Sequence, residues 1–407
     1  MNASDSHVDD RLARRNALVL AVAQAIGGSA APIVIGTGGL AGDYLLGLAG
    51  LPRSYATVPV TMFVLGTAAA SIPANLLMKR IGRRAGFMLG AFASGLGSLL
   101  ACWALVVGSF PVFVLATGLA GAAAAFVQAY RYAAADTASD DFRPRAISWV
   151  MAGGVMAGVV GPQTVIWTKD LFSPILFAGA FLGAAMLQVV NLAVLAFVRI
   201  PQLPAAVAAR AGRPLGEIMR SRTFVVAALC GVASYAMMSL VMTATPLAMV
   251  ACGLSQTEAA LGIQWHVIAM FGPSFFTGTL LTRFGKPAVV AAGMALLAAA
   301  GVTALSGLSV AHFWTALVLL GVGWNFGFVG ATAMVTDSYR PEERAKVQAA
   351  NEFLIFATVA LASFSSGKLL TLAGWDTINM MIFPVVALCV ALLAWFVTAG
   401  VRPRAAV

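Results

Sequence analysis

Charged residues are scarce in this chain of 407 residues. Asp, Glu, Lys and Arg make up only 10% of it, whereas hydrophobic residues make up 60%, and the mean hydropathy is +0.91. A soluble globular protein carries about 25% charged residues, so the composition excludes a water-soluble fold. The apolar residues are numerous enough for roughly a dozen membrane spans of about 20 residues each.

Residues that carry chemistry are also few. The 4 cysteines and 3 histidines show no metal-ligand spacing, so we expect no metal and no cofactor. The paired carboxylates or the nucleophile with its base that an enzyme needs are not found, and neither is a G-x-x-x-x-G-K-[ST] loop for ATP. A membrane-embedded enzyme is therefore disfavoured. A transporter-like sensor or scaffold is disfavoured as well, because it would add a soluble domain or a long tail.

The apolar runs predict an all-α integral membrane protein, because a segment in lipid must satisfy its own backbone hydrogen bonds. Twelve spans are expected, at residues 16–41, 54–78, 86–108, 110–133, 146–168, 173–198, 222–250, 257–282, 287–308, 311–336, 347–372 and 375–400.

Basic residues between the spans set the expected orientation. With the N-terminus inside, 21 of the 25 Lys and Arg residues fall in cytoplasmic segments, and only Arg53, Lys169 and Lys368 fall outside. This asymmetry is the positive-inside signal. We therefore expect a multi-pass protein of the cell (inner) membrane with both termini in the cytoplasm. The formal net charge of +10 then indicates contact with membrane lipids and not with nucleic acid.

The chain divides into two halves of six spans. We expect a cytoplasmic tail at 1–15, a six-helix bundle at 16–198, a cytoplasmic central loop at 199–221, a second six-helix bundle at 222–400, and a cytoplasmic tail at 401–407. The turn after the second span reads Lys79-Arg80-Ile81-Gly82-Arg83-Arg84. The turn after the eighth reads Thr282-Arg283-Phe284-Gly285-Lys286, half a chain later. Such a duplication is typical of secondary transporters.

This pattern resembles the major facilitator superfamily, whose loop signature is G-x-x-x-D-R-x-G-R-R, and the resemblance covers nearly the whole chain. The matching residues of the two copies are Arg80, Gly82, Arg83, Arg84, Gly278, Arg283, Gly285 and Lys286. The resemblance implies twelve helices in two pseudo-symmetric six-helix bundles. The physics of the turn is independent of the family, since Gly82 and Gly285 permit a tight reversal.

The family's acidic loop residue is replaced by Lys79 in one copy and by Thr282 in the other. In the family the acid helps to latch the two halves. One hypothesis is an inverted latch in which Lys79 pairs with Glu352 of the eleventh span. The alternative is that Lys79 only extends to the headgroup level.

Ionisable residues within spans are costly and are candidates for coupling or gating. They are Glu352 in the eleventh span, Arg131 near the inner end of the fourth, and His266 in the eighth. Each has a structural alternative: Arg131 could be a snorkelling arginine, and His266 a packing residue with one hydrogen bond.

Polar and aromatic residues near mid-span are candidates for a substrate cavity between the halves. They are Gln24, Gln128, Gln163, Tyr235, Gln264, Trp324 and Asn325. An aromatic platform with amide donors suits a neutral or weakly anionic organic molecule. The alternative for each amide is a hydrogen bond between helices without a ligand.

We therefore expect a monomeric secondary transporter that moves a small organic solute, such as a metabolite or vitamin, by alternating access coupled to protons. Efflux of a drug or toxic compound is the alternative. The fifth span carries Gly153-Gly154-Val-Met-Ala-Gly158-Val-Val-Gly161-Pro162, which resembles the family's exporter motif G-x-x-x-G-P, but the glycine pair expected three residues later is Val165-Ile166. The arginine expected in the fourth span is absent near Thr117. Uptake is therefore slightly favoured.

Overall fold

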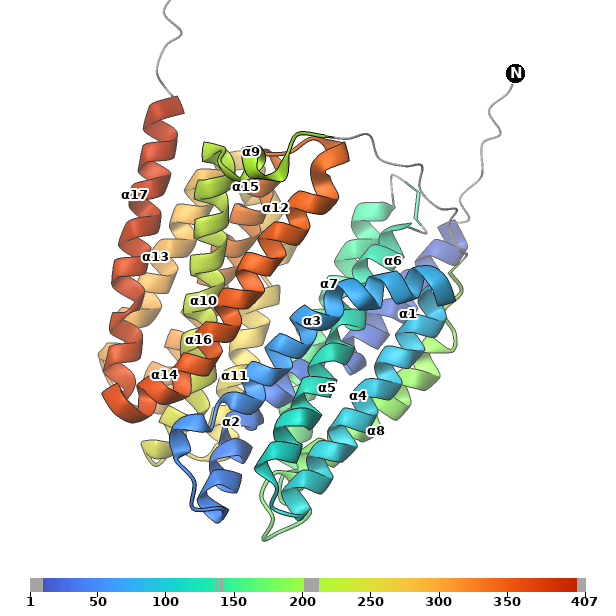
Figure 1. The fold of residues 1–407 in the computed structure, drawn as a ribbon, viewed down its shortest axis with the longest axis vertical. Coiled ribbons are helices and arrows are strands. Elements are labelled where there is room, and N and C mark those ends of the chain that lie inside the picture. The colour runs from blue at the N-terminus through green and yellow to red at the C-terminus, as the bar shows by residue number, and fades with distance from the viewer. Residues whose placement is uncertain (1–9, 137, 140–141, 201–211, 401–407) are drawn as a thin grey trace, which may run out of the picture. The chain divides into compact units, whose positions relative to one another are not determined.

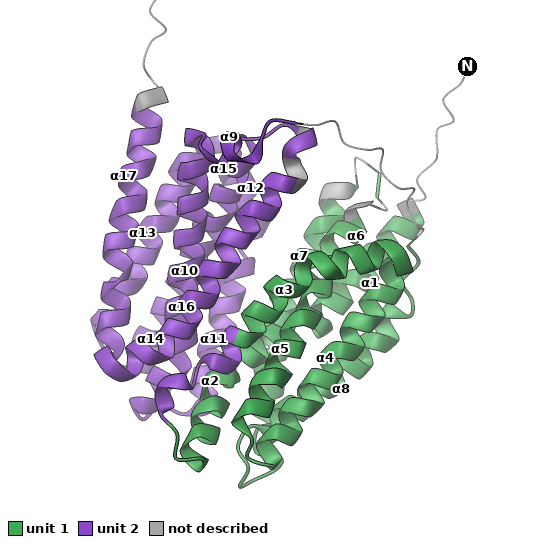
Figure 2. Cartoon of the chain, in the orientation of Figure 1, with its two compact units in different colours: residues 1–51, 62–205 green, residues 52–61, 206–407 purple. Residues whose placement is uncertain are grey.

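The computed structural model describes residues 10–136, 138–139, 142–200 and 212–400, and this part of the chain is helical without strands. Figure 1 shows its helices, and Figure 2 shows the two compact units that they form. Unit 1 comprises residues 1–51 and 62–205, and unit 2 comprises residues 52–61 and 206–407. Most of the expected tails and the middle of the expected central loop, at 1–9, 201–211 and 401–407, lie outside the described residues.

Unit 1 is built from the first eight helices. They are α1 (Asp10–Gly27), α2 (Ala30–Leu48), α3 (Val58–Ile81), α4 (Arg83–Val106), α5 (Phe110–Gln128), α6 (Tyr130–Asp136), α7 (Arg143–Thr168) and α8 (Ala178–Leu195). The first four residues of α3 are counted with unit 2. One buried core cluster of this unit centres on Phe87 and Tyr130, whose rings meet edge to face with centroids 4.7 Å apart.

Unit 2 holds the remaining elements. They are η1 (Arg53–Tyr55), α9 (Leu215–Met219), α10 (Arg222–Ala251), α11 (Gln256–Phe271), α12 (Ser274–Phe284), α13 (Lys286–Leu305), α14 (Val310–Trp324), the π-helical turn η2 (Asn325–Val329), α15 (Gly330–Thr336), η3 (Pro341–Glu343), α16 (Arg344–Met380) and α17 (Ile382–Gly400). Helix α10 packs along both α16 and α17.

The helices account for the twelve expected spans. In the described residues, ten stretches are long and apolar enough to cross a membrane, and the bent pair α11–α12 makes an eleventh. The last stretch, Lys346–Thr398, has 53 residues and contains Gly374 in a non-helical conformation (φ 81°, ψ 175°). As one straight helix it would be about 80 Å long, far more than the roughly 30 Å of a bilayer core. The reversal at Gly374 therefore separates the eleventh span from the twelfth.

Three spans are less regular than the sequence pattern indicated. The first is interrupted at Gly28 and Ser29 and extends to Leu48, beyond the expected end at 41. The eighth bends by 42° between α11 and α12, where Gly272 and Pro273 interrupt the helix. The tenth contains the π turn η2. Hydropathy reports only which residues are apolar, so it does not reveal such interruptions.

Small residues bring the helix backbones close together, as the many glycines predicted. A Cβ atom on Gly121 would lie 2.0 Å from the Phe63 carbonyl oxygen, and one on Gly66 would lie 2.2 Å from that of Gly118. Only glycine permits such contact between α3 and α5. Close backbone approach is the main source of van der Waals contact between helices that have no hydrophobic driving force in lipid.

The two loop glycines adopt almost the same conformation. Gly82 has φ 87° and ψ 154°, and Gly285 has φ 84° and ψ 152°. This region of backbone space is accessible essentially to glycine alone. Each glycine directly precedes a helix, α4 in one unit and α13 in the other. The expected tight reversals are thus present at the same place in both copies of the motif.

We predict that Gly82→Ala or Gly285→Ala destabilises the protein by about 1–3 kcal/mol, because alanine is strained at these angles. A Cβ on Gly285 would meet no neighbour within 4 Å, so the cost comes from the backbone and not from a clash. Thermal unfolding of purified protein measures the effect. Gly278→Ala is the matched control, since Gly278 also faces open space but lies inside α12. Equal melting temperatures for Gly285→Ala and Gly278→Ala would contradict the prediction.

Candidate functional site

Aromatic side chains gather in unit 2 around Trp324, at the end of α14. The Phe328 ring stacks on Trp324 with centroids 5.1 Å apart and an interplanar angle of 13°. Tyr235 of α10 meets both rings edge to face, at 5.3 and 5.1 Å. Phe356 of α16 lies 6.3 Å from Tyr235, and Phe271 of α11 lies 6.2 Å from Trp324. The aromatic cluster formed by these five residues brings the predicted Tyr235 and Trp324 together.

Trp324 carries an unsatisfied polar atom in this cluster. Its side chain is 6% exposed, and its Nε1–H has no hydrogen-bond partner in the described part of the chain. Buried polar atoms nearly always find a partner, and an unpaired one costs about 1–3 kcal/mol. The indole N–H is therefore a donor available to a bound molecule.

The backbone beside Trp324 is unusual. The turn η2 is π-helical, and π-bulges occur frequently at functional sites. Gly327 lets this turn approach its neighbours, because a Cβ there would lie 2.3 Å from Ser234 Oγ. A Cβ on Gly293 would lie 2.3 Å from the Gly327 nitrogen. The glycine-flanked sequence thus positions the aromatic cluster against α10 and α13.

Asn325 forms hydrogen bonds across the break between α11 and α12. Its Nδ2 donates to the Met270 carbonyl oxygen and to Ser274 Oγ, both at 2.7 Å, and its Oδ1 accepts from Thr277 Oγ1 at 2.6 Å. The side chain is fully buried. These contacts match the alternative in which the amide forms hydrogen bonds between helices without a ligand, since both amide hydrogens are donated to groups within the unit. A cavity role for Asn325 stays a prediction.

His266 and Gln264 of α11 are both buried. The Nδ1 atom of His266 lies 2.7 Å from the Leu317 carbonyl oxygen, and its Nε2 has no partner among the described residues. One hydrogen bond to a neighbouring helix is the arrangement expected under the structural alternative, in which His266 is a packing residue. Proton transfer by His266 stays a prediction.

The predicted residues of unit 1 lie on separate helices. Gln24 of α1 and Gln163 of α7 are half-buried, whereas Gln128 is exposed at the end of α5. Arg131 of α6 donates from Nη2 to Tyr132 Oη at 3.0 Å, and its guanidinium lies 4.8 Å from the Tyr132 ring centre. Their assignment to a cavity or gate stays a prediction.

Two buried amide side chains on α8, Gln188 and Asn191, were not predicted from the sequence. Gln188 Nε2 donates to the Gly27 carbonyl oxygen at 3.4 Å, and Asn191 Nδ2 donates to Gln188 Oε1 at 3.2 Å. They lie beside the interruption between α1 and α2. Their spacing of three residues within an apolar span was the available signal, because such residues share one helix face.

The loop motif positions its basic residues differently in the two copies. Lys286 bonds to both Asp337 carboxylate oxygens at 2.6 Å and to the Ala333 carbonyl oxygen at 3.0 Å. This ties the start of α13 to the end of α15, where helix carbonyls lack internal partners. Lys79 and Arg80 are exposed at the end of α3. Glu352 is exposed on α16 of unit 2, and its pairing with Lys79 stays a prediction.

A buried carboxylate organises the segment before α9. The Glu343 side chain is fully buried and accepts from Arg213 Nε at 2.9 Å, Arg213 Nη2 at 2.7 Å and the Arg213 backbone N–H at 2.8 Å. The Arg340 N–H donates to it as well, at 2.9 Å. Lys346 Nζ donates to the Arg213 carbonyl oxygen. Gly212 is required, since a Cβ there would lie 2.4 Å from Glu343 Cγ.

The hydrogen bonds from Arg213 hold the pKa of Glu343 well below its usual value, and the same bonds raise the pKa of Arg213. Hydrogen bonds to the charged form favour ionisation. The ion pair therefore remains charged throughout the physiological range.

We predict that Asn325→Ala destabilises the protein by about 2–4 kcal/mol, because it removes three hydrogen bonds and leaves the Met270 carbonyl oxygen unpaired in the interior. The melting temperature in detergent reports this. Asn75→Ala is the control, since Asn75 is exposed and its amide donates to Ser71 of its own helix. A melting temperature equal to that of Asn75→Ala would refute the structural role of Asn325.

Glu343→Gln is expected to lower the melting temperature by several degrees at neutral pH. Because the folded pKa of Glu343 is depressed, its contribution is complete above the ordinary value of 4.5 and is lost as the pH falls through the folded value. The difference in melting temperature between wild type and Glu343→Gln should thus be constant above that pH and shrink below it. Glu342→Gln, at the exposed neighbour, is the control. A difference that grows on acidification would show that the ion pair is not its source.

Comparisons with known proteins agree with this architecture. A family model described as Major Facilitator Superfamily matches residues 16–326 and 227–406. The riboflavin transporter RfnT of Brucella anthropi is 51% identical over 383 residues, which cover 93% of this chain and 95% of that protein. The uncharacterized MFS-type transporter YdeG of Bacillus subtilis is 29% identical over 91% of this chain and 89% of its own.

The fold also matches a solved structure. The crystal structure of the human organic anion transporter MFSD10 (TETRAN) aligns with a TM-score of 0.64 at 15% identity, over 94% of this chain and 99% of that one. This likeness shows the fold. With the family match over nearly the whole sequence, the all-α membrane architecture and the assignment as a transporter and not an enzyme are established. This chain belongs to the Major Facilitator Superfamily.

Proposed function

We propose that this protein transports riboflavin or a closely related flavin across the cell membrane. The observation that carries the proposal is the 51% identity with a riboflavin transporter over 93% of the chain. Identity at this level over nearly the whole chain supports a shared class of substrate.

The aromatic cluster supports a flavin as substrate. The isoalloxazine ring of riboflavin is flat and aromatic, and it carries carbonyl oxygens that accept hydrogen bonds. Trp324, Phe328 and Tyr235 offer faces and edges for such a ring, and aromatic pairs contribute about 0.5–1.5 kcal/mol beyond burial. The unpaired Trp324 Nε1–H would donate to a flavin carbonyl oxygen. Riboflavin is also uncharged at neutral pH, in keeping with the few charges inside the spans.

The proposed mechanism is alternating access coupled to protons, with the protein acting as a monomer in the inner membrane and both termini in the cytoplasm. The distribution of Lys and Arg supports this orientation. We propose uptake as the direction, because the exporter motif is incomplete in the sequence.

Transport by purified protein in proteoliposomes tests the substrate. Radiolabelled riboflavin should accumulate, unlabelled riboflavin should compete, and an imposed inward proton gradient should raise the initial rate. Accumulation without any response to the gradient or to a protonophore would overturn proton coupling alone. The absence of riboflavin movement in either direction, in protein that remains folded, would overturn the proposed substrate.

Trp324→Phe should raise the KM for riboflavin about threefold to tenfold, because it keeps an aromatic ring but removes one hydrogen-bond donor. Trp324→Ala should weaken transport further, since it also removes the stacked ring. Trp103→Phe is the matched control, because Trp103 lies on α4 and is 54% exposed. An unchanged KM for Trp324→Phe would exclude the indole N–H as a substrate contact.

A further inference from the structure

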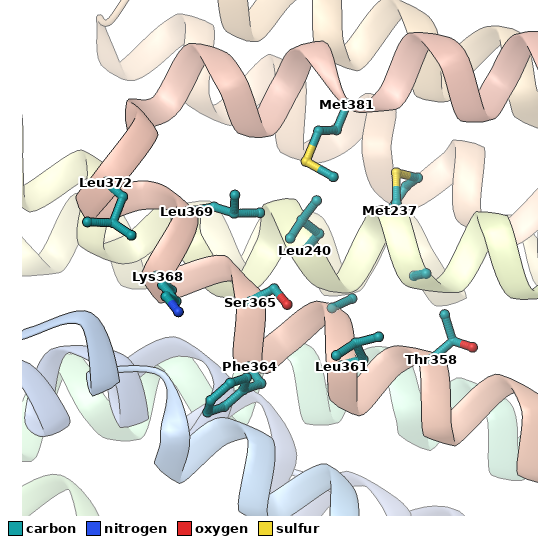
Figure 3. A pocket seen from close by; sticks show the side chains of 12 residues that line it. Met237, Leu240, Thr358, Leu361, Phe364, Ser365, Lys368, Leu369, Leu372 and Met381 are labelled. Carbon is teal, nitrogen blue, oxygen red and sulfur yellow. The ribbon is translucent and has the colours of Figure 1, made fainter.

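A second feature of unit 2 is an apolar groove between α10, α16 and Met381, the residue that joins α16 to α17, with a volume of about 500 Å³. Figure 3 shows Met237, Leu240, Leu369 and Met381 gathered in it. Its polar side chains come from α16 and are Thr358, Ser365 and Lys368. The volume is within the range of ligand pockets, about 300–1,000 Å³.

The groove lies on the opposite side of its helices from the aromatic cluster. Successive residues of an α-helix are rotated by about 100°. On α10, Met237 and Leu240 are therefore about 200° and 140° around the axis from Tyr235. On α16, Thr358 and Ser365 are about 200° and 180° around from Phe356. The groove is thus separate from the proposed flavin site.

The groove residues of α16 form one stripe along the helix. Thr358, Leu361, Ser365, Lys368 and Leu372 follow one another at spacings of three and four residues, which places them on one face. Leu361 is 64% exposed and Leu372 is 72% exposed. A face with this much exposed apolar surface is in contact with lipid in a membrane, so acyl chains have access to the groove.

The part of the stripe from Thr358 to Lys368 corresponds in length to one leaflet, and Leu372 lies one turn beyond it. Lys346 and Lys368 are 22 residues apart on α16, about 33 Å along the axis, close to the roughly 30 Å of a bilayer core. The two lysines thus mark the two headgroup levels. Thr358 lies ten residues before Lys368, about 15 Å deeper, which is the bilayer midplane. The groove therefore runs from the midplane to the headgroups on the side opposite Lys346.

Lys368 gives this groove a charged end. Within the described part of the chain, neither an ion pair nor a hydrogen bond engages its ammonium group, whereas Lys169 is paired with Asp170 at 2.6 Å. An ammonium group at the headgroup level above an apolar, leaflet-long groove is complementary to a phosphate above an acyl chain. We propose that this groove binds an anionic glycerophospholipid, with one acyl chain along α16 and the headgroup phosphate at Lys368.

Photolabelling of the full-length protein in vesicles tests the proposal without a transport assay. The probes are phosphatidylglycerol and phosphatidylcholine, each with a diazirine on one acyl chain and each diluted into phosphatidylcholine. Mass spectrometry of peptides should find adducts on groove residues such as Leu361 and Leu369, and more with the phosphatidylglycerol probe. Equal labelling by the two probes, or adducts that avoid the groove, would overturn the proposal.

Lys368→Gln should reduce labelling of the groove by the phosphatidylglycerol probe about fivefold, the value of one lysine near an anionic surface. Labelling by the phosphatidylcholine probe should not change, which also shows that the variant is folded. Lys368→Arg should restore the preference for phosphatidylglycerol. Lys169→Gln is the control, because that lysine already has a carboxylate partner. Loss of the preference in Lys169→Gln, or its persistence in Lys368→Gln, would refute the role of Lys368.

Discussion

The structure depends on the need to pair every backbone polar group within lipid. A regular helix meets this need by itself, but a helix that bends exposes donors and acceptors that water cannot reach. The interruption between α11 and α12 shows how the chain resolves this. The Asn325 amide donates a hydrogen bond to the Met270 carbonyl oxygen, and it forms two further hydrogen bonds with Ser274 and Thr277. Polar residues in the spans thus have a structural task before any contact with substrate is considered.

Asn325 links the interruption between α11 and α12 to the aromatic cluster. Asn325 directly follows Trp324, so the residue that stabilises the bend also fixes the backbone that carries the indole ring. For the flavin proposed above, a platform whose backbone is already fixed and whose indole N–H is unpaired would lower the cost of ordering the site on binding. Outside the spans, the Arg213–Glu343 pair has the corresponding role, since it joins the segment before α9 to the start of α16.

Hydropathy and charge predicted most of the fold because they act over whole segments. The twelve spans, the reversal before the last one, and the special backbone at Gly82 and Gly285 all follow from composition and spacing. The site was harder to predict from the sequence, because the roles of individual amides depend on neighbours far away in the chain. Asn325 was singled out for a ligand, yet its described contacts are with α11 and α12. Gln188 and Asn191 were missed, since their spacing places them on one helix face but does not indicate that Gly27, 161 residues from Gln188, lies opposite.

The π turn at Asn325–Val329 has a mechanical consequence. A π turn accommodates an extra residue relative to an α-helix, and one residue corresponds to about 100° of rotation. The orientation of α15 about its axis is therefore set by this turn, and so is the position of Asp337 opposite Lys286. If the turn became regular α-helix, α15 would rotate about its axis, and Asp337 would no longer lie beside Lys286. Helix α15 thus couples the backbone conformation at the aromatic cluster to the salt bridge at its other end.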